Sequence, residues 1–131
     1  MIKVRQLVKS FGDQLAVAGL DLEAQQGDIL GLIGPNGAGK TTTLRILATL
    51  EQADAGHVEL SGYDLFDNIE AVRKVVGFMP ERFGLYDELT VRDYLEFFAR
   101  IHGFDNRQIR RRVDDLITLC DLEGKVDAGC G

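Results

Sequence analysis

Residues 34–42 constrain this chain more than any other stretch, because Gly-Pro-Asn-Gly-Ala-Gly-Lys-Thr-Thr satisfies the pattern G-x-x-x-x-G-K-[ST]. The apolar run of residues 29–33 precedes it, and residues 42–50 follow at helical spacing. A buried strand, a glycine-rich loop and a helix in this order are typical of a site for nucleotide phosphates. We therefore predict a triphosphate site here. The alternative is a glycine-rich turn that binds nothing.

Each residue type in this phosphate loop, residues 34–42, has a physical role in the prediction. Glycines let the backbone adopt positive φ, so that consecutive N–H groups can point at the phosphates, and the helix that opens at Lys40 adds its dipole. Lys40 is expected to reach the β- and γ-phosphates, Thr41 to ligate Mg²⁺ and Thr42 to donate to a phosphate oxygen. The predicted nucleotide-binding residues of the loop are Gly34, Pro35, Asn36, Gly37, Ala38, Gly39, Lys40, Thr41 and Thr42.

Composition narrows the remaining function classes. The chain has 131 residues, enough for one domain, and its net charge of −6 argues against a surface that coats nucleic acid. Neither a signal peptide nor a run of membrane-spanning length is visible. Cys120 and Cys130 fit no metal pattern, which predicts buried or free thiols in a reducing cytoplasm. His57 and His102 are interpreted as structural or surface residues. The basic residues Arg107, Arg110, Arg111 and Arg112 alternate with acidic ones, which favours a solvated helix face.

Periodicity divides the chain into a mixed part and a helical part. Alternation predicts strands over residues 2–9 and 20–24, with turns at 11–14 and 26–28. Further along, residues 57–60 and 75–79 are predicted as strands and residues 69–74 as a short helix. From residue 90 the pattern is helical: Thr90 and Asp93 form a capping box, and Asp105 opens a second helix. The apolar stripe predicted for that second helix is Ile109, Val113, Leu116, Ile117 and Cys120.

The spaced motifs together resemble the nucleotide-binding subunit of an ATP-binding-cassette (ABC) transporter, over about residues 1–128. The resemblance rests on residues 7–12, the phosphate loop, residues 54–58 and residues 77–81. It implies an α/β fold: a partial P-loop NTPase core with an antiparallel β subdomain and the start of a helical subdomain. We expect one domain, residues 1–131, with the β subdomain and core in 1–82 and the helical start in 83–131. Residues 80–89 would be the hinge.

Phe11 and Glu81 acquire roles only through this resemblance. Phe11 stands where the family places an aromatic that stacks on adenine; the alternative is a turn aromatic that caps the core. Glu81 stands where the family places a glutamine that senses Mg²⁺ and the γ-phosphate. A carboxylate there could hold a Mg²⁺-bound water but would repel an uncompensated phosphate, and a plain surface carboxylate is the alternative. The residues around Glu81, with Gly84, Leu85 and Tyr86, are similar to an export-type branch often called ABC-2.

The resemblance also implies partners. It implies ATP with Mg²⁺, a separate transmembrane permease that docks near Tyr86, Asp87 and Glu88, and a second nucleotide-binding domain. Exposed loop residues are the alternative for the docking site. The protein would be cytoplasmic and peripheral at the inner face of the membrane.

Several family motifs cannot be matched here: the L-S-G-G signature loop, the acidic strand with the catalytic Glu, and the switch His. We therefore expect a C-terminally incomplete domain that is marginally stable by itself. Three readings stay open. The first is the ATPase subunit of an ABC exporter, the second a truncated module that binds Mg·ATP without hydrolysis, and the third a non-transport ABC protein or another phosphate-loop NTPase.

Overall fold

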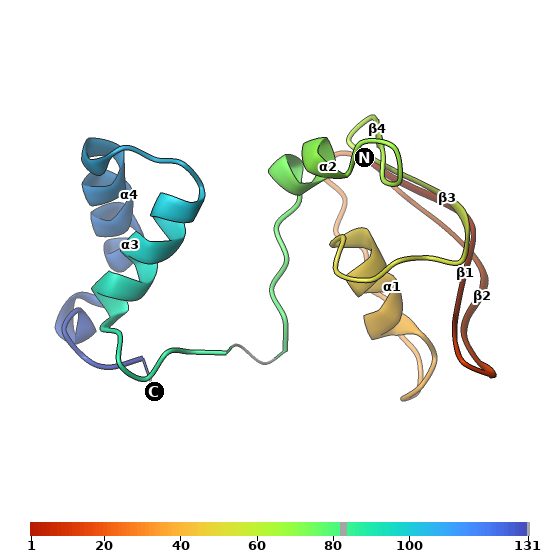
Figure 1. Cartoon of the computed structure of the whole chain (residues 1–131), viewed down its shortest axis with the longest axis horizontal. Helices are drawn as coiled ribbons and strands as arrows, with labels where there is room; N and C mark the ends of the chain where they lie inside the picture. The colour runs from red at the N-terminus through yellow and green to blue at the C-terminus, as the bar shows by residue number, and fades with distance from the viewer. Residues whose placement is uncertain (82–83, 131) are drawn as a thin grey trace. The chain divides into compact units, whose positions relative to one another are not determined.

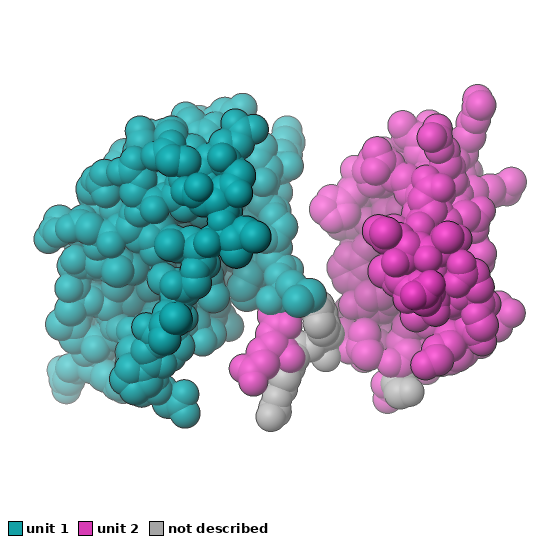
Figure 2. Space-filling view, turned by 180° about the vertical axis from the view of Figure 1, so that it is seen from behind, with its two compact units in different colours: residues 1–79 teal, residues 80–131 magenta. Residues whose placement is uncertain are grey.

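The structure is a computed structural model, and it describes residues 1–81 and 84–130. The chain forms two compact units, Met1–Met79 and Pro80–Gly131, which Figure 2 colours separately. Each unit has its own hydrophobic core, so each is described by itself.

The first unit is built on a four-stranded antiparallel sheet with the order β2-β1-β3-β4. Its long hairpin joins β1 (Ile2–Phe11) to β2 (Gln14–Ala24), and β3 (Ala55–Leu60) pairs with the other side of β1. The short β4 (Tyr63–Asp64) completes the sheet, and Figure 1 shows β1, β2 and β3 running side by side. The strands predicted at residues 2–9, 20–24 and 57–60 and the turn at 11–14 are confirmed, although β2 begins earlier than predicted, at Gln14.

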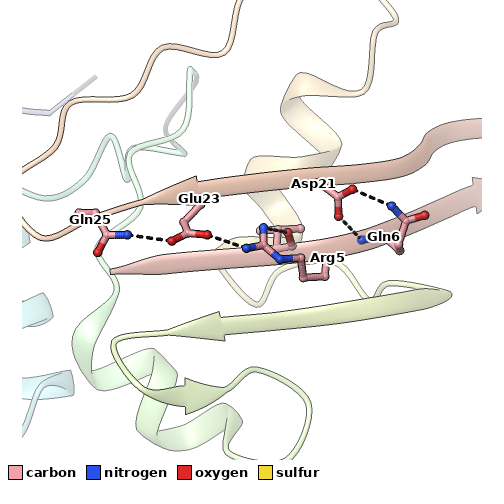
Figure 3. Close-up of polar contacts among 6 residues, drawn as sticks. Arg5, Gln6, Asp21, Glu23 and Gln25 are labelled. Carbon is pink, nitrogen blue, oxygen red and sulfur yellow. Dashed lines mark hydrogen bonds and ion pairs between the residues drawn. The ribbon is translucent and has the colours of Figure 1, made fainter.

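A bulge at Gln6 interrupts the centre of β1. The pairing register shifts between Val4 and Leu7, and Gln6 has a φ of 47°. Asp21 of β2 accepts both the backbone N–H of Gln6, at 2.8 Å, and its side-chain amide, at 2.7 Å (Figure 3). On the other side Gly56 touches the bulge, because a Cβ on Gly56 would lie 2.7 Å from the Gln6 carbonyl oxygen. The bulge therefore depends on a carboxylate in one neighbouring strand and a glycine in the other.

Two helices supply the rest of the core of the first unit. They are α1 (Lys40–Leu47) and α2 (Ile69–Val75). Their apolar residues pack on the inner face of the sheet, as alternating strand residues and helical stripes require. The buried cluster is Val4, Leu7, Val17, Ile46, Leu47, Val58, Leu60, Leu65 and Val72.

The strands predicted at residues 29–33 and 75–79 are wrong. Val75 is the last residue of α2, and neither residues 29–33 nor 76–79 are strands. Ile29 and Ile33 are fully exposed, and Met79 is 81% exposed. Within the described chain, residues 29–34 make no backbone hydrogen bond to another backbone group. A strand exists only when a neighbour pairs with it, and none of the described residues does so here.

The second unit is helical. It contains α3 (Val91–Ile101), α4 (Asn106–Leu119) and the 3-10 turn η1 (Glu123–Lys125). The capping box of Thr90 and Asp93 is confirmed, and Asp105 caps α4 as predicted. The core is Ile109, Val113 and Ile117, so the predicted stripe is correct for these three residues, whereas Leu116 and Cys120 are exposed. The predicted arginines lie on the exposed face of α4, and both cysteines are free thiols.

Candidate nucleotide-binding site

The phosphate loop links residues 29–33 to α1 through two left-handed glycines. Gly37 has a φ of 83° and Gly39 a φ of 81°, conformations that L side chains rarely adopt. Gly34 is not in this region, so two of the three loop glycines use the positive φ that glycine allows. A turn of the loop is closed by Ala38, whose N–H donates to the Pro35 carbonyl at 3.2 Å.

Lys40 lies over this loop. Its ammonium donates to the carbonyl oxygens of Gly34 and Pro35, each at 2.7 Å. These two contacts hold a positive charge beside the loop backbone, at the point where α1 begins. An anion at the loop would meet both the lysine and the unpaired N–H groups of the first turn of α1.

The three threonines after Lys40 differ in exposure. Thr43 is buried, and its hydroxyl donates to the Gly39 carbonyl at 2.9 Å, so this buried hydroxyl has a hydrogen-bond partner in the first turn of α1. Thr41 is exposed and Thr42 is half-buried. Sequence reasoning missed Thr43, although its position four residues after Gly39 is the signal for a hydroxyl that bonds back to a helix carbonyl.

The loop packs on the sheet at one point. A Cβ on Gly39 would lie 2.3 Å from the Ala16 carbonyl oxygen, so only glycine fits against β2. Beside this contact is an open groove of about 390 Å³. Its lining residues come from β2, the loop and α1, and are Ala16, Val17, Ala18, Gly19, Leu20, Asp21, Gly37, Ala38 and Thr43.

Phe11 lies at the end of β1 next to the hairpin turn. It pairs with Gln14, its side chain is half exposed, and the Lys9 ammonium lies 5.1 Å from its ring centroid. Gln14, the pairing partner of Phe11, is two residues before Ala16, and the Ala16 carbonyl contacts the phosphate loop. Phe11 and this contact therefore lie near the same end of the β1–β2 hairpin.

Lys9 is buried and paired with two carboxylates. Its ammonium lies 3.3 Å from Glu51 and 3.4 Å from Asp54. Burial by itself would lower the pKa of Lys9, but the hydrogen bonds to Glu51 and Asp54 more than offset it, so the pKa is raised. The pKa of Asp54 is lowered, first by the backbone N–H of Ser10 and then by Lys9, against the opposing effect of burial.

Glu81 and Tyr86 belong to the second unit. Glu81 is exposed, and its predicted role toward Mg²⁺ stays a prediction. Tyr86 is 53% exposed and packs against Tyr94 and Phe97, with ring centroids 6.4 and 6.2 Å apart. His57 is exposed, as the interpretation of a surface residue predicts, and its Nδ1 lies 3.1 Å from Asp64.

The donor set fits a nucleotide phosphate. The cradle combines a lysine ammonium, left-handed glycines and the start of a helix, which are cation and N–H donors with no carboxylate among the loop residues 34–42. For Mg²⁺, the exposed Thr41 hydroxyl could supply one oxygen ligand and the phosphates others, in keeping with the few protein ligands that Mg²⁺ takes. Within residues 1–81 and 84–130, no group of three or more His, Cys, Asp or Glu side chains could hold a metal.

These features define a phosphate-loop nucleotide-binding protein. The model of the ABC transporter family matches residues 17–130, and the chain belongs to that family. It is 44% identical to the Daunorubicin resistance ATP-binding protein DrrA3 of Streptomyces coeruleorubidus, over 87% of this chain and 36% of the relative. It is 40% identical to the Nod factor export ATP-binding protein I of Burkholderia lata, over 99% of this chain and 43% of the relative. The chain thus spans about two fifths of these relatives.

Solved structures support the fold. The "Structure of ATP binding subunit of ABC transporter" superposes with a TM-score of 0.82 at 29% identity, over 98% of this chain and 54% of that one. A dimeric ATP-binding cassette, MJ0796, described as bound to ADP and Pi, also has a TM-score of 0.82, at 22% identity over 99% of this chain and 62% of its own. The predicted α/β fold of a partial P-loop NTPase, with an antiparallel sheet and helices, is confirmed by these neighbours.

Proposed function

We propose that this chain supplies the ATP-binding site of an export-type ABC transporter subunit, which couples ATP binding and hydrolysis to transmembrane export through a separate permease. The observation that carries the proposal is the Lys40 ammonium held at the phosphate loop, in a chain of the ABC family whose relatives are named for resistance and export. The subunit would be cytoplasmic and peripheral at the membrane. None of the helices in residues 1–81 and 84–130 combines the length and apolar character of a membrane span.

In this proposal the chain's own residues bind and orient the nucleotide. The loop N–H groups and Lys40 hold the β- and γ-phosphates, and Thr42 donates to a phosphate oxygen. Thr41 holds Mg²⁺ beside them, and Mg²⁺ neutralises phosphate charge when bound. Phe11 stacks on the base from the neighbouring end of β1. Glu81 keeps its expected role toward Mg²⁺, and the surface around Tyr86, Asp87 and Glu88 would receive the permease.

The test is nucleotide binding by calorimetry with Mg·ATP, comparing the chain with Lys40→Ala. A hydrogen-bonded charge contributes about 1.5–3 kcal/mol, so the variant should bind roughly 10- to 100-fold more weakly or not at all. Lys74→Ala is the matched control, because Lys74 is an exposed lysine on α2 remote in sequence from the loop. Equal affinities of Lys40→Ala and the unaltered chain would refute the proposed site.

Two further measurements separate the readings. Phosphate release above that of Lys40→Ala indicates an ATPase, whereas binding without release indicates a module that holds Mg·ATP and does not turn it over. Tighter binding of GTP than of ATP would contradict the proposed ATP site. Copurification with a permease encoded beside the gene would test the partner, and Mg·ATP-dependent self-association would test the second nucleotide-binding domain.

A further inference from the structure

Lys9 occupies an unusual position for a lysine. It is only 9% exposed, and lysine side chains are rarely buried without partners. Its ammonium is shared by three groups: the Glu51 carboxylate, the Asp54 carboxylate and the face of the Phe11 ring. The buried cation therefore links two carboxylates to a half-exposed aromatic ring.

The two carboxylates come from the segment that follows α1. Glu51 lies four residues after the end of that helix, and Asp54 directly precedes β3. Asp54 also makes two hydrogen bonds to β1. Its carboxylate accepts the Ser10 N–H at 2.7 Å, and its own N–H donates to the Val8 carbonyl at 2.9 Å. The end of β1 that carries Phe11 is therefore tied to the segment after the helix that begins at the phosphate loop.

Lys9 and Phe11 are two residues apart on one strand, so their side chains project toward the same side of the sheet. A cation over one face of an aromatic ring is attracted by the ring quadrupole and restricts the orientation of the ring. The Phe11 side chain is half exposed, which leaves ring surface for a planar partner. A base that stacks there meets a ring whose orientation is already set, which lowers the entropy lost on binding.

We propose that Lys9 is a positioning residue for the base: it holds the Phe11 ring ready to stack, and Glu51 and Asp54 hold Lys9. This inference rests on the proposed function, and in particular on base stacking by Phe11. It predicts that Lys9 affects the part of the affinity that comes from the base and leaves the part that comes from the phosphates unchanged.

The experiment compares two ligands, Mg·ATP and Mg·tripolyphosphate, which share the phosphate chain but not the base. Lys9→Met keeps the length of the side chain and removes its charge. It should weaken Mg·ATP about three- to tenfold and change tripolyphosphate affinity less than about twofold. Lys9→Arg keeps a cation and should retain most of the Mg·ATP affinity. On a Phe11→Ala background, Lys9→Met should cause no further change in the ratio of the two affinities.

A spectroscopic signature adds an independent readout. The chain has no tryptophan, so Phe11→Trp places its single tryptophan at the stacking position. Mg·ATP should quench this tryptophan and tripolyphosphate should not. Adding Lys9→Met should shift the emission of the free protein and reduce the quenching by Mg·ATP.

Two results of the affinity comparison would overturn the inference. Equal weakening of the binding of both ligands would mean that Lys9 only stabilises the fold, and tighter Mg·ATP binding would mean that Lys9 competes with the base for the ring.

If Lys9→Met fails to fold, Glu51→Gln, which removes one carboxylate partner, must show the same selective loss of Mg·ATP affinity. Lys74→Ala is the control for loss of a lysine. A chain that binds neither ligand refutes the proposed function, whereas binding of both with a ratio insensitive to Lys9 refutes this inference alone.

Discussion

The antiparallel sheet and the segments at residues 29–33 and 76–79 are all rich in apolar residues, but their surroundings differ. In the sheet, Val4, Leu7 and Val58 are fully buried, and every strand has a hydrogen-bonded neighbour. Residues 29–33 and 76–79 have no such neighbour among the described residues, and Ile29, Ile33 and Met79 face solvent. Apolar composition therefore predicts the tendency to form a strand, whereas a pairing partner decides whether the strand exists.

Truncating one side chain in each region should give the largest difference in stability between the two regions. Leu7→Ala removes a fully buried side chain and should lower the free energy of unfolding by about 2–5 kcal/mol. Ile33→Ala removes a side chain that is 98% exposed and should change it by less than about 0.5 kcal/mol. Urea unfolding of the 131-residue chain measures both. A loss above about 1.5 kcal/mol for Ile33→Ala would show that this segment is packed in solution.

A matched pair of glycines sharpens the comparison. Gly56 and Gly37 both have positive φ, at 109° and 83°, conformations that L side chains rarely adopt, so alanine is strained at both positions. A Cβ on Gly56 would also lie 2.7 Å from two atoms of the β1 bulge, whereas a Cβ on Gly37 meets nothing within 4 Å. Gly56→Ala should therefore be less stable than Gly37→Ala by about 1–3 kcal/mol, measured by thermal unfolding. Equal stabilities would mean that β3 moves away from the bulge in solution.

Lowering the pH is expected to have the smallest effect on the free energy of unfolding, and this effect arises in the antiparallel sheet. The Asp67 backbone N–H lowers the pKa of Asp64 below its ordinary value of 3.8, with further help from the Phe66 N–H and from His57 and against partial burial. Because the folded-state pKa is the lower one, the stabilisation is present above pH 3.8 and is lost as the pH falls through the folded-state pKa.

Asp64→Asn should therefore flatten the fall of unfolding free energy below pH 4, measured by urea unfolding at several pH values. Asp13→Asn, in the exposed hairpin turn, is the control. An unchanged slope in Asp64→Asn would show that these hydrogen bonds do not persist in solution.

Local signals explain what could be predicted. The capping box at the start of α3, the start of α4 at Asp105 and the hairpin turn after Phe11 all depend on residues a few positions apart, and each formed as expected. The bulge at Gln6, the packing of Gly39 on Ala16 and the burial of Lys9 depend on residues distant in the chain. No periodicity reports such contacts, so sequence reasoning missed them.

The sequence by itself determined the class of site, because a phosphate cradle needs specific residue types at fixed spacing, and these are visible in residues 34–42. The sequence also carries the motifs that resemble those of ABC transporter subunits, and the family match confirms this resemblance. The tertiary structure decided which apolar segments become strands, which threonine is buried and that Lys9 contacts both Phe11 and the carboxylates of Glu51 and Asp54. The physical reason is that strand pairing and the burial of charge are relations between residues far apart in sequence, and only folding brings those residues together.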